Sequence, residues 1–268
     1  MTDDTHTPFE PHIPFEQGET ALLVDRKKRR YLVQLATDKD FHCHAGVIPH
    51  SEIIGKSEGT ELRTNKGSYF TALRPTLSEI VLKMPRGAQV IYPKDLGTIL
   101  MTADILPGAR VLEAGVGSGA LSMTLLRAGA TVIGYEKRED FQERAVSNVN
   151  KYCDPETAAR FHTEVRDVYN GIDEIGIDRI VLDLPEPWNA VGPACEALRP
   201  GGILCAYTPS IVQATQLRER LEDSPFGMCD TIEVLHRGWY IEGAAVRPNH
   251  RMVAHTGFLT SARLLTPT

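Results

Sequence analysis

The sequence lacks any hydrophobic run long enough to span a membrane, and its first 18 residues are polar and hold three prolines, unlike a secretion signal. Its five cysteines form no Cys-x-x-Cys pair and are odd in number, which argues against a zinc site or a disulfide framework. Positive charge is not in excess either, because the chain has 29 Lys and Arg residues and 35 Asp and Glu residues. We therefore expect a soluble cytoplasmic protein that holds no metal and meets any nucleic acid through a local basic patch.

The N-terminal part of the chain predicts an arm followed by a small domain. Residues 1–18 predict a flexible arm, because their prolines prevent regular strand pairing. Short β-like runs separated by glycines follow at residues 20–24, 31–35, 41–43, 59–64 and 69–73. This spacing predicts a small all-β domain over residues 19–78.

The first two of these runs enclose a strongly basic turn. The turn consists of Arg26, Lys27, Lys28, Arg29 and Arg30. Such a run is either a solvated turn or a phosphate-binding surface. It is the densest positive charge in an acidic protein, so we carry phosphate binding as a hypothesis.

From residue 79 the pattern changes to alternating helices and strands. An apolar face at helical spacing predicts a helix over residues 93–106, with Pro93 in its first turn. Strands are expected at residues 110–113, 131–136, 177–183 and 202–207. This alternation predicts an α/β domain over residues 79–268, built on a parallel, doubly wound sheet. Two later β-like runs, residues 231–235 and 255–262, are expected to pair as an antiparallel hairpin at the sheet edge.

A glycine-rich turn joins the first strand of this domain to a helix. Gly115, Gly117 and Ala120 satisfy the dinucleotide pattern G-x-G-x-x-G/A, so a nicotinamide site remains open. Glu113 and Gly119 extend the pattern to E-x-G-x-G-x-G, which resembles motif I of S-adenosylmethionine-dependent methyltransferases. A carboxylate at the strand tip repels a pyrophosphate and attracts an ammonium group. The acid therefore favours a methyltransferase.

Acidic residues also stand at the ends of later strands. Glu136 ends the strand 131–136, the usual place of a carboxylate that binds a ribose diol. Asp167 follows another strand, where an adenine amino group can be recognised. Asp183 ends the strand 177–183 and precedes Leu-Pro-Glu-Pro-Trp. In this loop Trp188 offers a flat face to a base, or else is a core residue behind a proline-rich strand exit.

Five motifs follow one another along the chain: Gln-Val-Ile-Tyr-Pro-Lys-Asp at 89–95, the glycine turn at 113–121, Tyr-Glu at 135–136, residues 183–188, and His-Thr-Gly-Phe-Leu at 255–259. In this order they resemble the tRNA (adenine-58-N1)-methyltransferase family, whose small N-terminal domain also resembles the basic, β-rich segment. The resemblance implies a class I, Rossmann-like methyltransferase fold in which residues 79–268 form the S-adenosylmethionine-binding catalytic domain. It also implies a homotetramer; in eukaryotic members a catalytic chain pairs instead with a related non-catalytic one.

The resemblance also assigns roles to single residues. The cofactor, S-adenosylmethionine, is expected to contact Ile91, Gly115, Gly117, Ser118, Gly119, Ala120, Leu121, Glu136, Phe141, Asp167, Val168 and Asp183. The target base is expected to lie against Tyr92, Pro185 and Trp188. The tRNA partner is expected to contact the basic turn, Thr256, and a second group formed by Arg247, His250 and Arg251, which is alternatively a solvated loop.

The implied reaction is methyl transfer to N1 of adenine 58 in the T-loop of tRNA, after extrusion of the base from its stack. Neutral N1 already carries a lone pair, so the site must orient the base rather than deprotonate it. Asp183, the expected catalytic residue, would accept a hydrogen bond from the N6 amino group and stabilise the positive charge that grows on the ring. Two alternatives stay open. One is a nicotinamide-dependent oxidoreductase, and the other is a non-catalytic RNA-binding partner subunit, in which we would expect the glycine turn and Asp183 to be replaced by other residues.

Overall fold

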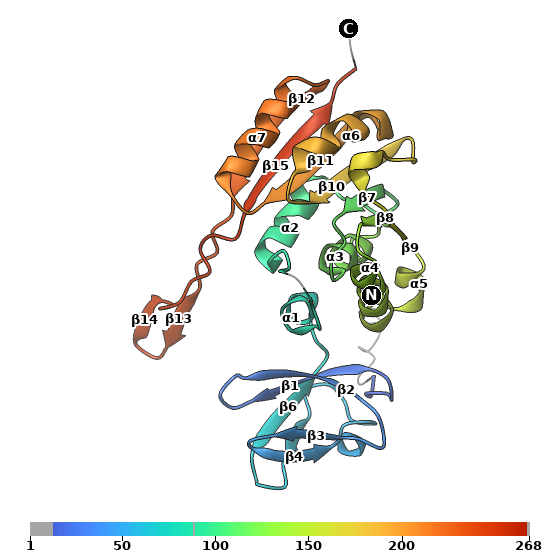
Figure 1. The fold of residues 1–268 in the computed structure, drawn as a ribbon. Coiled ribbons are helices and arrows are strands. Elements are labelled where there is room, and N and C mark those ends of the chain that lie inside the picture. The colour runs from blue at the N-terminus through green and yellow to red at the C-terminus, as the bar shows by residue number, and fades with distance from the viewer. Residues whose placement is uncertain (1–12, 88, 267–268) are drawn as a thin grey trace, which may run out of the picture. The chain divides into compact units, whose positions relative to one another are not determined.

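The computed structural model describes residues 13–87 and 89–266, and it divides the chain into two compact units, one ending at Met84 and the other beginning at Pro85 (Figure 1). The strands of the first unit are β1 (Thr20–Asp25), β2 (Arg30–Gln34), β3 (Asp40–Cys43), β4 (Gly46–Pro49), β5 (Glu61–Arg63) and β6 (Tyr69–Leu73). They form an antiparallel sheet in the order β2-β1-β6-β5 and a separate β3–β4 pair. The expected β-rich composition of this segment is thus observed, with one strand, β4, that the sequence did not indicate.

Aromatic and aliphatic side chains fill the core of the first unit. The rings of Tyr31, Phe41 and Phe70 meet edge to face, with centroids 5.3 to 6.1 Å apart. Helix α1 (Leu77–Lys83) closes the unit, and Thr76 and Glu79 form a capping box at its start. Because α1 belongs to this unit, the unit extends to Met84, beyond the expected boundary at residue 78.

The flexible arm expected over residues 1–18 is wrong for its last residues; residues 1–12 lie outside the described part of the chain. Phe15 is buried in the core of the first unit, and its N–H donates to the carbonyl of Lys56 at 2.9 Å. Pro14 forms an isolated bridge to Ser57, and Gly18 donates to Leu35 at 2.9 Å. The prolines prevent a regular strand, but one aromatic anchor is enough to hold the segment.

The second unit is an α/β domain with a seven-stranded sheet in the order β12-β15-β11-β10-β7-β8-β9. Its strands are β7 (Arg110–Ala114), β8 (Thr131–Glu136), β9 (Phe161–Val165), β10 (Ile177–Asp183), β11 (Leu198–Thr208), β12 (Phe226–Glu233) and β15 (Phe258–Leu264). Its helices are α2 (Pro93–Thr102), α3 (Ala120–Arg127), α4 (Glu139–Tyr152), α5 (Pro155–Ala158), α6 (Val191–Ala197) and α7 (Ile211–Glu222). Short 3₁₀ helices cover His50–Glu52 in the first unit and Val168–Asn170 and Pro187–Ala190 in the second. No helix in the described part of the chain is long and apolar enough to cross a lipid bilayer.

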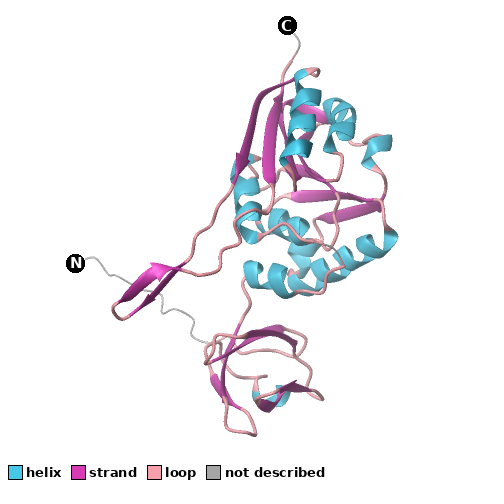
Figure 2. Ribbon diagram, turned by 60° about the vertical axis from the view of Figure 1, so that its left-hand side comes forward, coloured by secondary structure: helices cyan, strands magenta, loops and turns pink. Residues whose placement is uncertain are grey.

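The sheet has the predicted mixed character. Strands β7 to β11 are parallel, whereas β15 pairs antiparallel with β11 and β12. The two C-terminal runs therefore do lie side by side. The segment between them holds a second, unexpected hairpin, β13 (Trp239–Glu242) and β14 (Ala245–Pro248), which extends away from the seven-stranded sheet (Figure 2).

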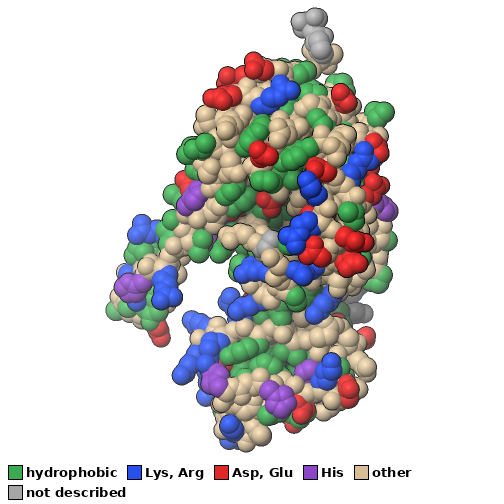
Figure 3. Space-filling model, viewed as in Figure 1, with side chains coloured by type: hydrophobic (Ala, Val, Ile, Leu, Met, Phe, Trp, Pro, Cys, Tyr) green, Lys and Arg blue, Asp and Glu red, His purple; other side chains and the backbone are tan. Residues whose placement is uncertain are grey.

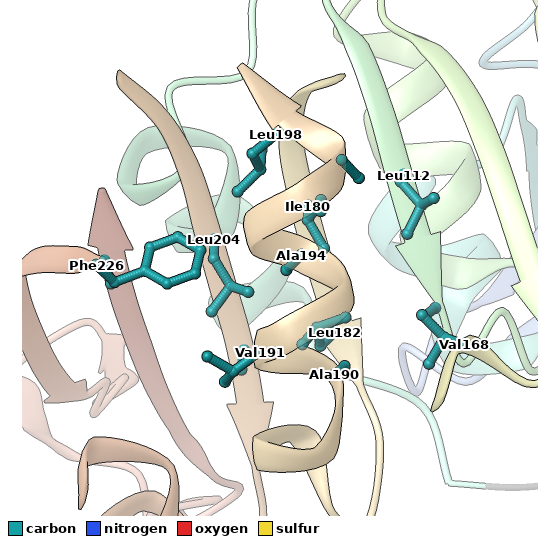
Figure 4. Packing of buried hydrophobic residues seen from close by; sticks show 14 of the residues in the cluster. Leu112, Val168, Ile180, Leu182, Ala190, Val191, Ala194, Leu198, Leu204 and Phe226 are labelled. Atoms are coloured by element: carbon teal, nitrogen blue, oxygen red, sulfur yellow. The ribbon is translucent and has the colours of Figure 1, made fainter. Parts of the chain in front are cut away.

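The core of this domain lies where α6 and α7 cover the central strands. Strand β10 is buried on both faces over most of its length, as expected of an apolar central parallel strand. Ile180 and Leu182 from β10 pack with Leu204, Ala194 and Val191 (Figure 4). The chain order reverses at β7, which pairs with β8 on one side and β10 on the other. Ligands of doubly wound sheets bind beyond the carboxyl ends of the strands at this point.

Candidate active site

The glycine turn after β7 brings the ends of two strands together. Gly115, Gly117 and Gly119 all have positive φ angles, of +87°, +56° and +81°. A Cβ atom at Gly115 would overlap the carbonyl oxygen of Asp183, so only glycine lets the turn approach the end of β10 this closely. Gly119 instead precedes α3, where a Cβ atom would lie 3.3 Å from the Ala145 backbone. Gly119, an expected cofactor contact, lines neither of the two cavities beside the turn, and it allows α4 to pack close to the turn.

A cavity of about 620 Å³ opens beyond the carboxyl ends of β7, β8 and β10, a size typical of small-molecule sites. It is lined by Gln89, Gly115, Gly117, Tyr135, Glu136, Lys137, Arg138, Phe141, Arg166, Asp167, Val168, Tyr169, Asp183, Leu184, Pro185, Glu186, Pro209 and Gln213. A smaller adjoining cavity shares Gln89, Gly115, Gly117 and Asp183 and adds Ile91, Glu113, Ser118, Ala120 and Leu121. Together the two cavities collect every expected cofactor residue except Gly119.

Three carboxyl groups converge on these cavities. Glu113 is fully buried in β7, and among the described residues no donor reaches its carboxyl oxygens with good hydrogen-bond geometry, although the nearby Ser122 lowers its pKa slightly against the larger effect of burial. Burial raises the pKa of Glu113 to about 8, with the nearby Asp183 and Glu136 carboxylates adding to the shift. Burial also raises the pKa of Asp183 to about 7, and Glu136 contributes again. The site therefore holds carboxyl groups that are costly to ionise in the free protein, and a positively charged ligand would favour their ionised forms.

Backbone N–H groups and a lysine orient the remaining acids. Glu136 accepts hydrogen bonds from the N–H groups of Gly117 at 2.9 Å and Arg138 at 3.0 Å, one on each carboxylate oxygen. Asp167 pairs with Lys137 at 2.9 Å, and this hydrogen bond lowers the pKa of its carboxyl group. Each Glu136 oxygen keeps a second lone pair that can accept from a ligand hydroxyl.

The residues expected to hold the base are only partly brought together. Pro185 lines the large cavity, and Gln213 donates to its carbonyl at 2.8 Å, which fixes the loop after β10. Tyr92 lines a neighbouring cavity that also contains Gln89. Trp188 instead packs against the hydrophobic core of the domain and does not line the large cavity. The alternative assignment of Trp188, a core residue at a proline-rich strand exit, is the one that the structure supports.

Sequence reasoning missed several residues of the cavity wall. Tyr135 precedes Glu136 and was part of a motif, but its ring was not expected to reach the site. Gln213 lies on α7, some 30 residues after Asp183, with nothing in the local sequence to mark it. Tyr169 lies beside Glu186, whose N–H donates to the Tyr169 hydroxyl at 3.3 Å. These contacts depend on how distant segments pack, so no local pattern could have revealed them.

Several cations of the basic turn between β1 and β2 are already engaged within the protein. Arg29 forms an ion pair with Asp25 at 2.6 Å, and Arg30 lies 3.4 Å from Glu79. The guanidinium of Arg26 lies over the Tyr69 ring, 4.0 Å from its centre, at a cavity of about 280 Å³ that Lys27 also lines. Among the described residues, no carboxylate lies within ion-pair distance of Lys27 or Lys28, so these two are the available cations.

The second expected basic group lies on and beside the β13–β14 hairpin. Arg247, His250 and Arg251 are exposed, and arginine and histidine side chains gather at this hairpin in Figure 3. Thr256 is placed differently: its hydroxyl donates to the buried Asp95 at 2.6 Å and accepts from Lys94 at 2.6 Å. Its single O–H is thus committed within the protein rather than offered to RNA.

Solved structures with the same architecture define the class of this protein. A SAM-dependent O-methyltransferase from Thermotoga maritima superposes with a TM-score of 0.90, at 35% sequence identity, over 95% of this chain and 96% of that chain. The tRNA (m1A58) methyltransferase TrmI of Aquifex aeolicus superposes with a TM-score of 0.83, at 30% identity, over 95% of this chain and 100% of that chain. Fold and site together therefore define a class I S-adenosylmethionine-dependent methyltransferase, which rules out the nicotinamide-dependent alternative.

Sequence comparison then defines the family. The family model described as "tRNA methyltransferase complex GCD14 subunit" matches residues 68–246, and the TrmI-like N-terminal model matches residues 14–61. The tRNA (adenine(58)-N(1))-methyltransferase TrmI of Thermus thermophilus is 38% identical over 90% of this chain and 95% of its own length. The TrmI of Methanocaldococcus jannaschii, named for adenines 57 and 58, is 36% identical over 91% of this chain and 94% of its own length. The chain belongs to this family of tRNA methyltransferases.

Proposed function

We propose that this protein transfers the methyl group of S-adenosylmethionine to N1 of adenine 58 in tRNA, and that it does so in the cytoplasm. The observation that carries the proposal is the position of Asp183, which ends a rigid buried strand, lines the cavity beside the glycine turn and has two further carboxyl groups next to it. The names of the curated relatives support the choice of substrate. The intact glycine turn and Asp183 speak against the alternative of a non-catalytic partner subunit.

The residues of the two cavities fit the proposed cofactor. The buried, unpartnered carboxyl group of Glu113 suits an ammonium group, because a cation would relieve the cost of ionising it. The free lone pairs of Glu136 suit a ribose diol, and Phe141 and Val168 offer apolar surfaces to an adenine beside Asp167. When bound, S-adenosylmethionine supplies an electrophilic methyl group on a sulfonium ion.

The chain's own residues then have to orient the acceptor base. We assign to Asp183 the role of accepting a hydrogen bond from the adenine N6 amino group, which fixes N1 in line with the methyl group and stabilises the positive charge that grows on the ring. Burial raises the pKa of Asp183 to about 7, so the positive charge of the bound cofactor would favour its ionised form. We propose that the adenine enters a slot beside Asp183, the base slot, and that Pro185 and Tyr92 form its two walls.

RNA binding is proposed to use two groups of cations. The tRNA phosphates would contact Lys27 and Lys28 on the basic turn and Arg247, His250 and Arg251 at the hairpin.

We further propose a homotetramer in which the β13–β14 hairpin contacts a second copy of this chain. In support, both strands of this two-stranded sheet have free edges, and it exposes Trp239, Ile241 and Val246.

The test is to incubate the protein with methyl-labelled S-adenosylmethionine and an unmodified tRNA transcript, and then to map the labelled nucleotide. We expect 1-methyladenosine at position 58, and none in a transcript with guanine at that position. Mapping must also cover position 57, because one relative is named for both, and ribose oxygens, because one structural neighbour is named an O-methyltransferase. Label confined to any other atom would overturn the proposal.

A further inference from the structure

A buried polar network lies at the start of α2, outside the two ligand cavities. The side chain of Asp95 is 0% exposed and that of Lys94 only 7%, and the two form an ion pair at 2.8 Å. The hydroxyl of Thr256, 161 residues further along, joins them by donating to Asp95 and accepting from Lys94, each at 2.6 Å. Every polar atom of this triad therefore has a partner, as burial at this depth requires.

The network continues to the strand beside Asp183. The hydroxyl of Tyr207 donates to the carbonyl of Thr256 at 2.5 Å, and Tyr207 is the register partner of Asp183 in the β10–β11 pair. A Cβ atom at position 257 would overlap the Tyr207 ring, so Gly257 lets this ring reach the Thr256 backbone. Burial raises the pKa of Tyr207 to about 12, with the Asp95 and Asp183 carboxylates adding to the shift, so the phenol remains a hydrogen-bond donor.

The network residues Lys94 and Asp95 lie in the first turn of α2, directly after its N-cap Tyr92. The N–H groups of Asp95 and Leu96 donate to the carbonyl of Tyr92 at 2.9 and 3.0 Å. Three segments that are distant in sequence thus meet: the first turn of α2 with Tyr92, the end of β11 with Tyr207, and the Thr256–Gly257 segment before β15. A buried ion pair contributes little to stability compared with apolar residues of similar volume, so stability alone does not account for this one.

We propose that Lys94, Asp95 and Thr256 are positioning residues, which hold the start of α2 and Tyr207 in place beside the Asp183 strand end so that the base slot is formed before the substrate binds. This inference rests on the proposed function, because the slot is defined by the base it receives. It replaces the expected role of Thr256 as an RNA contact. A preformed slot affects turnover, because displacements of about 1 Å at a reacting centre cost up to about 10²-fold in rate.

The test compares Thr256→Val, which removes the hydroxyl and keeps the shape, with Thr256→Ser, which restores the hydroxyl. We expect Thr256→Val to lower kcat about 10-fold or more, while KM for tRNA and the calorimetric Kd of S-adenosylhomocysteine stay within about 2-fold. Thr256→Ser should recover kcat to within about 3-fold of the parent. Thr98→Val is the matched control, because the Thr98 hydroxyl donates only to the carbonyl of Lys94 within the same helix, at 2.9 Å.

The other outcomes each contradict the inference. A raised KM for tRNA with unchanged kcat would make Thr256 an RNA contact, and an unchanged kcat would make the network dispensable. If Thr256→Val does not fold, Tyr207→Phe, which removes the hydroxyl that donates to the Thr256 carbonyl and leaves the buried ion pair intact, replaces it, and it too should lower kcat without raising KM for tRNA. The parent enzyme is assayed first: if it methylates another atom, the proposed function fails, and the same comparison of kcat and KM still tests the network on that reaction.

Discussion

At the residue scale, Asp183 combines a fixed position with an unusual ionisation. Its carboxylate extends from the last residue of β10, so a strand rather than a loop holds it beside the glycine turn. Asp183→Asn keeps the shape and one acceptor while removing the charge. We expect kcat to fall about 10²-fold, the scale of losing one preorganised electrostatic contact. Affinity for tRNA should change little, because phosphates supply most of it.

Single-turnover kinetics at saturating tRNA and cofactor measure this effect without interference from product release. Asp178→Asn is a matched control on the same strand, since Asp178 pairs with Arg199 at 2.6 Å away from the cavity. An Asp183→Asn enzyme that methylates at the parent rate would assign this carboxylate a purely structural role.

Glu113 links cofactor binding to pH. Its pKa is raised from 4.5 to about 8 in the folded protein, so the folded state binds its proton more tightly than the unfolded state does. The ligand-free protein should therefore lose stability as the pH rises from about 5 to about 8. Glu113→Gln carries no such proton, so its Tm relative to the parent should increase with pH across this window, while its affinity for S-adenosylmethionine should fall.

Thermal unfolding of parent and variant at pH 5.5 and 8.5, without ligand, measures the first effect, and calorimetric titration measures the second. Asp183 shifts in the same direction and remains in both proteins, so the difference between them isolates Glu113. Equal pH dependence in the two proteins would contradict the assignment of the raised pKa to Glu113.

At the element scale, the glycine turn contains a natural pair of test positions. A Cβ atom at Gly115 would overlap the Asp183 carbonyl, whereas at Gly117 it would meet nothing closer than the Gly115 carbonyl at 3.9 Å. Gly115→Ala should therefore displace the end of β10 and abolish cofactor binding. In the ligand-free protein Gly117→Ala should incur only the cost of a left-handed backbone, about 1 to 2 kcal/mol. Thermal unfolding without ligand distinguishes the two, because Gly117 also lines the cofactor cavities, and equal losses of stability would refute a steric role for Gly115.

The basic turn between β1 and β2 also divides into two classes of cation. Lys27 and Lys28 have no carboxylate partner among the described residues, whereas Arg29 is paired with Asp25. Replacing both lysines by serine should reduce the slope of log K against log salt for tRNA binding by about 1 to 2 units, with cofactor affinity unchanged. Arg29→Ser should mainly affect the turn itself. Measured salt slopes that do not differ from the parent would identify the run as a solvated turn.

The sequence predicts those elements whose signal is local. The bounds of β8 and β10 agree with the expected strands at 131–136 and 177–183, because each is an apolar run ending in an acid. Strand β4 was missed, since its four residues begin with glycine and end with proline. The β13–β14 hairpin was missed because its residues are exposed and bury no face, which leaves no alternating pattern to read.

The candidate site shows the same limit. The glycine turn and the acids at strand ends follow from the positions of strands, and the two cavities gather them. Whether Trp188 or Tyr135 reaches the cavity depends on side-chain packing: Tyr135 lines the cavity while buried in the core, and the partly buried Trp188 packs against that core without lining the cavity. The Lys94–Asp95–Thr256 network joins residues more than 160 positions apart, so no local pattern could indicate it.

At the scale of the whole molecule, a protein of formal net charge −6 has to bind a polyanion. The carboxyl groups of the ligand cavity lie where a positively charged cofactor is proposed to bind and to favour their ionised forms, while cations available for phosphates lie on the basic turn and at the hairpin. This separation lets one acidic chain serve two ligands of opposite charge. It also makes the hairpin a candidate for two roles, RNA contact through its basic residues and self-association through its apolar ones.

The self-association role has a direct test. Trp239, Ile241 and Val246 are 57%, 72% and 61% exposed on an isolated two-stranded sheet, which rarely persists in water without another surface to cover it. Replacing all three by serine should convert the proposed tetramer into a smaller species, measured as molar mass by light scattering after size exclusion. Ile175→Ser with Met228→Ser is the control, because these side chains are 79% and 76% exposed but lie outside the hairpin. A triple variant with the mass of the parent would show that other surfaces hold the copies together, whereas a parent that is already a monomer would remove the proposed assembly altogether.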